Sequence, residues 1–282
     1  MLMYITPISK QSSETSMKEI RLAGQIVKTL TKDRIQYPGR LLVDTFGIIA
    51  RCGVLLILYS FVFKLNSGII NGTTFLFAAW SIFFYFAFSV SRLRDIPLKI
   101  MQDVQTGNVE VLFSKPISYL SYRMWWSVGS GLYSFVVISI LGFFVLAFTI
   151  GLPPTMTTSI FVPTLILAIL FGSILTLFLY SVVGLMAFWI EDITPIFWMV
   201  DKAVMILGGS YLPVALFPPL MFKLALYSPF GASQFITHTV YETWQTNWYQ
   251  LIGIQLIWII LLVAIVYFMF ERAKKKVSVN GG

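Results

Sequence analysis

The sequence has little of what soluble enzymes are built from. Only 11% of its 282 residues are charged, and it contains one cysteine, Cys52, and one histidine, His238. One cysteine allows no disulfide within the chain, and neither residue has the companions that a metal site needs. The sequence also lacks the phosphate-binding pattern G-x-x-x-x-G-K-[ST]. We therefore predict a chain that is not an enzyme and that binds no metal or cofactor of its own.

Apolar residues are abundant instead, at 57% of the chain. Soluble domains are about 25% charged, and a water-soluble fold of this length has no interior large enough for so much apolar surface. We predict an all-α integral membrane protein, because a helix in lipid satisfies its own backbone hydrogen bonds. The first ten residues lack the pattern of a cleavable signal, so we expect the first span to direct insertion and to stay in the mature protein.

Six segments have the length and apolarity of a membrane-spanning helix, which needs about 20 residues. They are 41–63, 74–90, 124–150, 160–190, 195–212 and 251–270. Residues 213–232 are also apolar, but four prolines interrupt them, so we expect short re-entrant helices before the last span. The predicted domains are a cytoplasmic N-terminus (1–40), a six-helix transmembrane domain (41–270) and a basic tail (271–282).

The placement of basic residues predicts the orientation. Seven Lys or Arg precede the first span, five lie in the loop 91–123 and four follow the last span, whereas the opposite side holds only Lys64 and Lys223. By the positive-inside rule, both termini and the loop 91–123 are cytoplasmic, and 213–232 is an outer region. Lipid headgroups and orientation thus explain the net charge of +8, and we expect no nucleic-acid partner.

A helix with two different faces is expected before the first span. Basic and polar residues recur every three or four positions, and apolar residues fall on the opposite side (Lys18, Arg21, Gln25, Lys28, Lys32; Ile20, Ala23, Ile26, Val27, Leu30). Such an amphipathic elbow helix lies in the cytoplasmic membrane interface. The alternative is an amphipathic helix that packs on another subunit. Tyr37-Pro38-Gly39 is expected to end the helix.

The cytoplasmic loop 91–123 has the pattern of a platform. Pro97 suits the first turn of a short helix, Gln105-Thr106-Gly107-Asn108 forms a polar turn, and Leu112 and Phe113 form a second apolar patch. These apolar side chains need a surface to rest on. One interpretation is a docking site for a cytosolic partner, and the other is a loop that packs only on its own chain.

The chain resembles the permease subunits of type II ABC exporters over about residues 17–275. The order of amphipathic helix, six spans and long first cytoplasmic loop is similar, and Gly107 through Leu112 to Pro116 resembles the family pattern G-x-x-x-x-L-L-x-x-P. The chain departs from it with Phe113 at the second leucine, which keeps the position apolar. The segment 207–213, followed by 216–218 and 227–230, resembles the outer re-entrant region of that family.

The resemblance implies a coupling helix in the first cytoplasmic loop that seats on a separate ATPase. By position, the coupling residues would be Asp103, Gln105, Thr106, Gly107, Asn108, Glu110, Val111, Leu112 and Phe113. It further implies two ATPase subunits that carry ATP and Mg, and a second permease chain, identical or different. The expected location is the bacterial or archaeal cell membrane, with lipids as further partners.

Charged and aromatic residues inside the spans are candidates for the substrate pathway. Asp44 and Arg51 are seven residues apart on one helix face, so we expect pairing between them or snorkelling of Arg51, with substrate contact as the alternative. Asp201 and Lys202 are expected to face protein or water, and structural pairing is their preferred use. The pathway candidates are Trp80, Phe84, Tyr85, Phe197, Trp198, Asp201 and Lys202, and Gly208 and Gly209 form a candidate hinge.

Three classes of function were weighed. An exporter permease fits the absence of a nucleotide site, and the aromatic, charge-poor spans suit a hydrophobic or amphipathic cargo, with polysaccharide or peptide left open. An ion-coupled carrier or channel usually places acids in several helices, whereas the second, third, fourth and sixth spans have none in their interiors. An intramembrane enzyme lacks its chemical residues. The first class is preferred.

Overall fold

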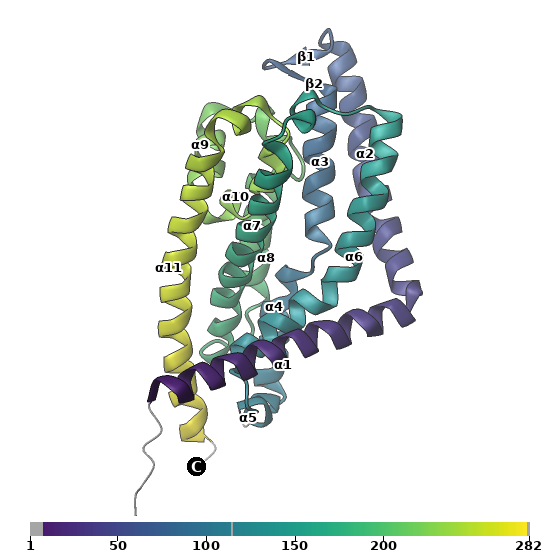
Figure 1. Cartoon of the computed structure of the whole chain (residues 1–282). Coiled ribbons are helices and arrows are strands. Elements are labelled where there is room, and N and C mark those ends of the chain that lie inside the picture. The colour runs from purple at the N-terminus through teal and green to yellow at the C-terminus, as the bar shows by residue number, and fades with distance from the viewer. Residues whose placement is uncertain (1–7, 114, 281–282) are drawn as a thin grey trace, which may run out of the picture.

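The computed structural model describes residues 8–113 and 115–280, which fold almost entirely into helices (Figure 1). Residues 1–7 of the predicted N-terminal segment, Ser114 of the loop and residues 281–282 of the tail lie outside the described residues. Five helices are long: α1 (Ile8–Gln36), α2 (Pro38–Leu65), α6 (Tyr119–Thr149), α7 (Phe161–Leu185) and α11 (Glu242–Asn280). The all-α class is confirmed.

Four helices in the described part of the chain are long and apolar enough to cross a membrane, namely α2, α6, α7 and α11. They indicate a membrane-embedded protein. The predicted second and fifth spans are shorter: α3 (Phe75–Ser89) has 15 residues and α8 (Thr194–Leu207) has 14, fewer than the 20 or so that a span needs. A fifth candidate arises if α3 and the segment Leu93–Gln105 form one span bent by 47°. The structure thus supports four or five spans, and six stays a prediction.

The first helix and the start of the membrane region are separated by the predicted break. Helix α1 ends at Gln36 and α2 begins at Pro38, because proline fits the first turn of a helix but interrupts the preceding one. Figure 1 shows α1 running crosswise over the lower part of the bundle, with the end of α11 continuing past it. On the basic face of α1, three side chains are exposed: Arg21, Lys28 and Lys32. Ala23 on the apolar face of α1, by contrast, packs against protein and is only 4% exposed. Helix α6 supplies that surface along α1.

Short elements connect the long helices at both ends. At the lower end of Figure 1, η1 (Leu93–Asp95) leads into α4 (Ile96–Gln105) and α5 (Asn108–Phe113), near the start of α1 and the end of α11. At the upper end, β1 (Ile69–Ile70) pairs antiparallel with β2 (Thr73–Thr74). The connecting Asn71 and Gly72 both have positive φ, of 49° and 72°, as a two-residue I′ hairpin turn requires.

The proline-rich region folds into several short pieces, as expected. It contains η4 (Val214–Leu216), α9 (Pro219–Tyr227) and α10 (Pro229–Ala232), and η5 (Phe235–His238) leads on to α11. η2 (Pro154–Thr157) precedes α7, and η3 (Met186–Phe188) follows it. Helix α7 forms the centre of the bundle, since α11, α4 and α8 all contact it.

Candidate functional site

The loop predicted to face the cytosol forms a compact helix–turn–helix, here called the platform (residues 96–113). Helix α4 carries Pro97 in its first turn, and the chain reverses at Gly107, whose φ is +72°. This left-handed backbone is accessible to glycine at little cost. The predicted short helix, glycine turn and second short segment are therefore present.

Buried polar contacts fix the platform to the bundle. Asp103 is 4% exposed; it forms an ion pair with Arg123 of α6 and accepts a hydrogen bond of 2.8 Å from the Tyr119 hydroxyl. The Gln105 side chain donates to the main-chain oxygen of Glu191, ahead of α8, at 2.8 Å. Asp103, which was expected at the ATPase contact, thus joins α4 to α6 and does not present its carboxylate at the surface.

The apolar residues of α5 rest on the chain's own helices. Leu112 is buried, and the Phe113 ring stacks on Tyr119 at 5.4 Å and on Phe270 of α11 at 5.9 Å between centroids. At these two positions the apolar side chains thus rest on their own chain, and docking of a partner at the loop stays a prediction. Apart from the buried aspartate, the other predicted coupling residues remain exposed. Gln105 is bound to the segment before α8, and the rest form a ridge at the tip of the platform: Thr106, Gly107, Asn108, Glu110 and Val111.

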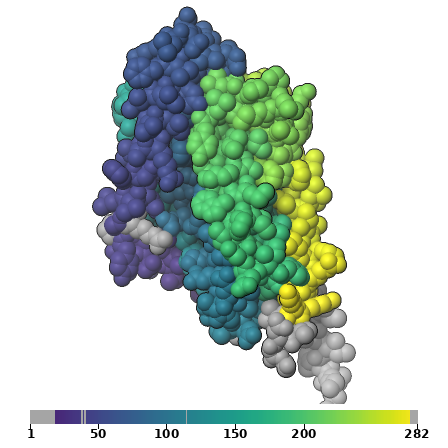
Figure 2. Space-filling model, turned by 180° about the vertical axis from the view of Figure 1, so that it is seen from behind, coloured from purple at the N-terminus to yellow at the C-terminus, as the bar shows by residue number. Residues whose placement is uncertain are grey.

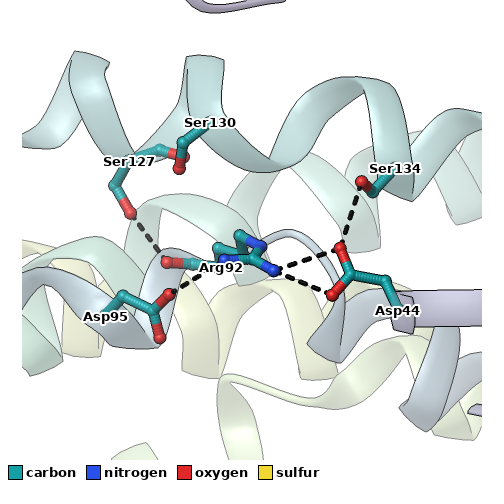
Figure 3. A network of polar contacts seen from close by, with 6 residues as sticks. All are labelled: Asp44, Arg92, Asp95, Ser127, Ser130 and Ser134. Atoms are coloured by element: carbon teal, nitrogen blue, oxygen red, sulfur yellow. Dashed lines mark hydrogen bonds and ion pairs between the residues drawn. The ribbon is translucent and has the colours of Figure 1, made fainter. Parts of the chain in front are cut away.

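A second polar cluster holds the turn between α3 and η1 (Figure 3). Arg92 adopts a left-handed backbone, with φ of +58°, which is uncommon for a residue with a side chain. Its guanidinium binds both carboxylate oxygens of Asp44, at 2.8 and 3.1 Å, and its carbonyl accepts a hydrogen bond from Ser127. Asp44 therefore pairs with Arg92, and the predicted pairing with Arg51 is wrong.

The buried carboxylate of α8 has a partner outside its own helix. Asp201 is 1% exposed, lies 3.1 Å from the Arg94 guanidinium and accepts a hydrogen bond of 3.0 Å from the Tyr180 hydroxyl. Lys202 points elsewhere, because its ammonium lies over the exposed Trp198 ring at 5.1 Å. The structural pairing expected for Asp201 is present, but its partner is not Lys202.

The predicted pathway residues divide into two groups. Trp80, Phe84, Tyr85 and Phe197 are 7% exposed or less and belong to the interior of this chain. Trp198 and Lys202, by contrast, lie at the surface of α8.

An open cleft runs beside α2 on the face seen in Figure 2, where α2 (purple to blue) and α8 (green) stand apart. The cleft has a volume of about 430 Å³. Three arginines line it, namely Arg51, Arg92 and Arg94, and we call it the arginine cleft. Asp44, Asp95 and apolar residues of α2 also line it. Sequence patterns placed Arg51 in a span, but they gave no sign that Arg92 and Arg94 would lie beside it.

The upper end carries a buried histidine. His238 is 5% exposed, its ring meets Phe235 edge-on at 5.0 Å, and burial lowers the pKa of His238 to about 4. His238 lines a pocket of about 330 Å³ together with Tyr241 and Glu242. In the part of the chain that the structure describes, no three His, Cys, Asp or Glu side chains gather closely enough to hold a metal ion.

Helix α8 ends directly before the glycine pair, five residues short of the predicted end of the fifth span at residue 212. Helix α8 ends at Leu207, and Gly209 has φ of +87°. A side chain at Gly208 would collide with Gln234, whose Cγ would lie 2.5 Å from the added carbon. Gly208 therefore permits the close fit of α8 to Gln234, and Gly209 supplies the left-handed turn that follows. Their role as a hinge stays a prediction.

Among known proteins, no family model matches the chain, and no curated protein matches it.

Proposed function

We propose that the chain is the permease subunit of an ABC exporter and couples to a separate ATPase through the ridge of the platform. The observation that supports this best is the combination of an exposed, mostly polar tip with a base that ion-pair, hydrogen-bond and ring contacts join to the bundle. Figure 1 places the platform at the end of the bundle where α1 crosses and α11 ends. The basic residues of the sequence concentrate on this side, which favours the cytoplasm.

The contacts at the base of the platform provide a physical route for coupling. Asp103 joins α4 to α6 through Arg123, Gln105 joins it to the segment before α8, and Phe113 joins α5 to α11. A displacement of the ridge by an ATPase would therefore move the ends of three helices together. In this proposal, one chain supplies half of the pathway, and a second permease chain supplies the other half.

An ion-coupled carrier is less well supported. Such a carrier needs an intramembrane carboxylate that can take up and release its ion. Three carboxylates in or near the predicted spans are candidates for this role. Each of them forms an ion pair with an arginine: Asp44, Asp103 and Asp201. An arginine partner favours the charged carboxylate and opposes its protonation.

The proposal predicts a charge-sensitive contact at the ridge. Glu110→Arg should prevent recovery of an ATPase subunit with the tagged chain from membranes of the source cell, because it reverses a charge at the tip while leaving the base intact. Glu242→Arg makes the same change on an exposed residue at the upper end and should leave recovery unchanged. If no ATP-binding-cassette subunit accompanies the unmodified chain, or if both variants behave alike, the proposal is wrong.

A further inference from the structure

Arg51 occupies an unusual position for a charged residue. It is the fourteenth of the 28 residues of α2, so it lies about 20 Å from either end of the helix at about 1.5 Å per residue. Its side chain is exposed on the surface of the chain. A guanidinium at this depth is costly in lipid unless it meets a counter-charge or water.

The carboxylates near Arg51 already have arginine partners. Of the two that line the arginine cleft, Asp44 binds Arg92, and Asp95 lies 3.9 Å from Arg92. Arg94, which also lines the cleft, binds Asp201 outside it. Within residues 8–113 and 115–280, Arg51 itself has no ion pair or side-chain hydrogen bond. Arg51 therefore meets either water or a counter-charge from outside the described chain.

The surroundings of Arg51 combine a polar space with an apolar strip. The arginine cleft, of about 430 Å³, is lined by Arg92 and Arg94 as well as Arg51. On the same face of α2, three and seven residues further on, Val54 and Leu58 are 67% and 51% exposed. If an anionic group in the cleft carried an apolar chain, that chain would thus lie along these exposed apolar side chains of α2.

We propose that the arginine cleft binds the phosphate or carboxylate head of an anionic amphipathic molecule, with Arg51 as its main ionic contact. The assignment of this molecule as the cargo rests on the proposed function. The cleft would then be the place where the cargo enters the pathway. A phosphate or carboxylate suits the site because arginine binds these planar or multi-oxygen anions through two parallel hydrogen bonds. The other two arginines are less available, since their carboxylate partners already occupy them.

Binding is tested on the purified full-length chain in a neutral detergent, by native mass spectrometry and thermal unfolding. The probes are phosphatidylglycerol, zwitterionic phosphatidylcholine and inorganic phosphate. Phosphatidylglycerol should bind and raise the unfolding temperature, phosphatidylcholine should bind at least tenfold more weakly, and phosphate alone should bind weakly because it has no apolar chain. Equal binding of the two lipids would overturn the proposal, and phosphate binding as tight as the anionic lipid would overturn its amphipathic part.

Matched variants locate the site. Arg51→Gln should weaken binding of phosphatidylglycerol by about ten- to a hundredfold, the effect of losing one charge-assisted contact, and Arg51→Lys should restore part of it. Lys64→Gln removes an exposed cation from the end of the same helix and should bind normally. If Arg51→Gln binds normally but alters association between copies of the chain, Arg51 faces a second copy and the anion site is wrong. Recovery of the ATPase with Arg51→Gln should be unchanged, so the proposed function is judged separately.

Discussion

At the scale of single residues, arginine–aspartate pairs connect segments that are distant in sequence. Arg92 holds a left-handed backbone at the end of α3 and ties it to α2 through Asp44, with side-chain exposures of 19% and 17%. Removing one member of such a pair leaves the other charge without compensation in a poorly solvated place. The pair is therefore expected to specify how α2 and α3 meet.

Asp44→Ala should lower the free energy of unfolding by about 2–3 kcal/mol, slightly below the loss for a fully buried pair because both side chains are partly exposed. Arg92→Gly removes the cation and also relieves the left-handed backbone. The double variant should therefore be more stable than the sum of the single losses predicts. Denaturant unfolding in a neutral detergent measures the free energy of unfolding of the two single variants and the double variant. If the two single losses simply add in the double variant, the pair is not coupled.

His238 gives a pH dependence with a defined sign. Its pKa is about 4 in the folded chain and about 6.5 in the unfolded chain. As the pH falls below about 6.5, His238 binds a proton in the unfolded state but not in the folded state. The free energy of unfolding therefore decreases until the pH reaches about 4. The full loss is about 3 kcal/mol. Above pH 6.5 the histidine has no effect.

The measurement is thermal unfolding between pH 4 and pH 8, for the unmodified chain and for His238→Gln. Glu242 and Tyr241 line the same pocket, and they remain in both proteins. The unmodified chain should lose more stability toward low pH than the variant. Parallel curves would show that His238 is already protonated, or accessible to water, in the folded chain.

At the scale of elements, sequence patterns predicted where the chain breaks or turns better than they predicted which residues contact one another. Proline at 38 and glycines at 107, 208 and 209 act on the local backbone, so their effects were predictable from nearest neighbours. The partner of Asp44 is 48 residues away, and the surface under Phe113 comes from α11. No local pattern specifies such contacts. Helix α3 differs from its predicted segment 74–90 by one residue at each end, whereas α8 was predicted five residues too long because Tyr211 and Leu212 extend the apolar segment past the glycine pair. Asn71-Gly72 between Ile-Ile and Thr-Thr is a hairpin signal in the sequence.

The turn of the platform depends on a residue that accepts positive φ. Gly107→Asn should retain the turn, because asparagine tolerates the left-handed region, whereas Gly107→Val should disfavour it by at least 1–2 kcal/mol, about the cost for residues with a branched or bulky side chain. Hydrogen exchange of α4 and α5 measures the local effect. No atom lies within 4 Å of a side-chain carbon added at this position, so steric collision does not confuse the comparison. Equal exchange in both variants would contradict the role of the backbone.

Close packing of α4 on α7 depends on another glycine. A carbon added to Gly184 would lie 2.7 Å from Ile100 Cδ1 and 3.1 Å from Pro97 Cα. Gly184→Ala should therefore cost about 1–3 kcal/mol through overpacking. Gly253→Ala, at a helical position in α11 with no such neighbour, should be neutral or stabilising by up to about 1 kcal/mol. The two variants are compared by unfolding, and a neutral Gly184→Ala would show that α4 can shift without loss.

At the scale of the whole molecule, the open question is how the helices cross the membrane. The basic residues predict that the platform and the tail share the cytoplasmic side and that α9 lies outside. In a Cys52→Ser background, an impermeant thiol reagent on intact cells should label Lys223→Cys and not Lys276→Cys. Disruption of the cells should expose the second site. Labelling of the tail in intact cells would reverse or invalidate the predicted orientation.

The central claim is that the ridge of the platform contacts an ATPase, and site-specific photo-cross-linking tests it most directly. A photoreactive amino acid replaces Asn108 at the tip of the ridge or, as a control, Thr246 at the upper end; both residues are exposed. The cross-linked products from native membranes are identified by mass spectrometry. The account predicts that position 108 captures a protein with an ATP-binding-cassette domain and that position 246 does not. Products at position 108 that contain only this chain would contradict it.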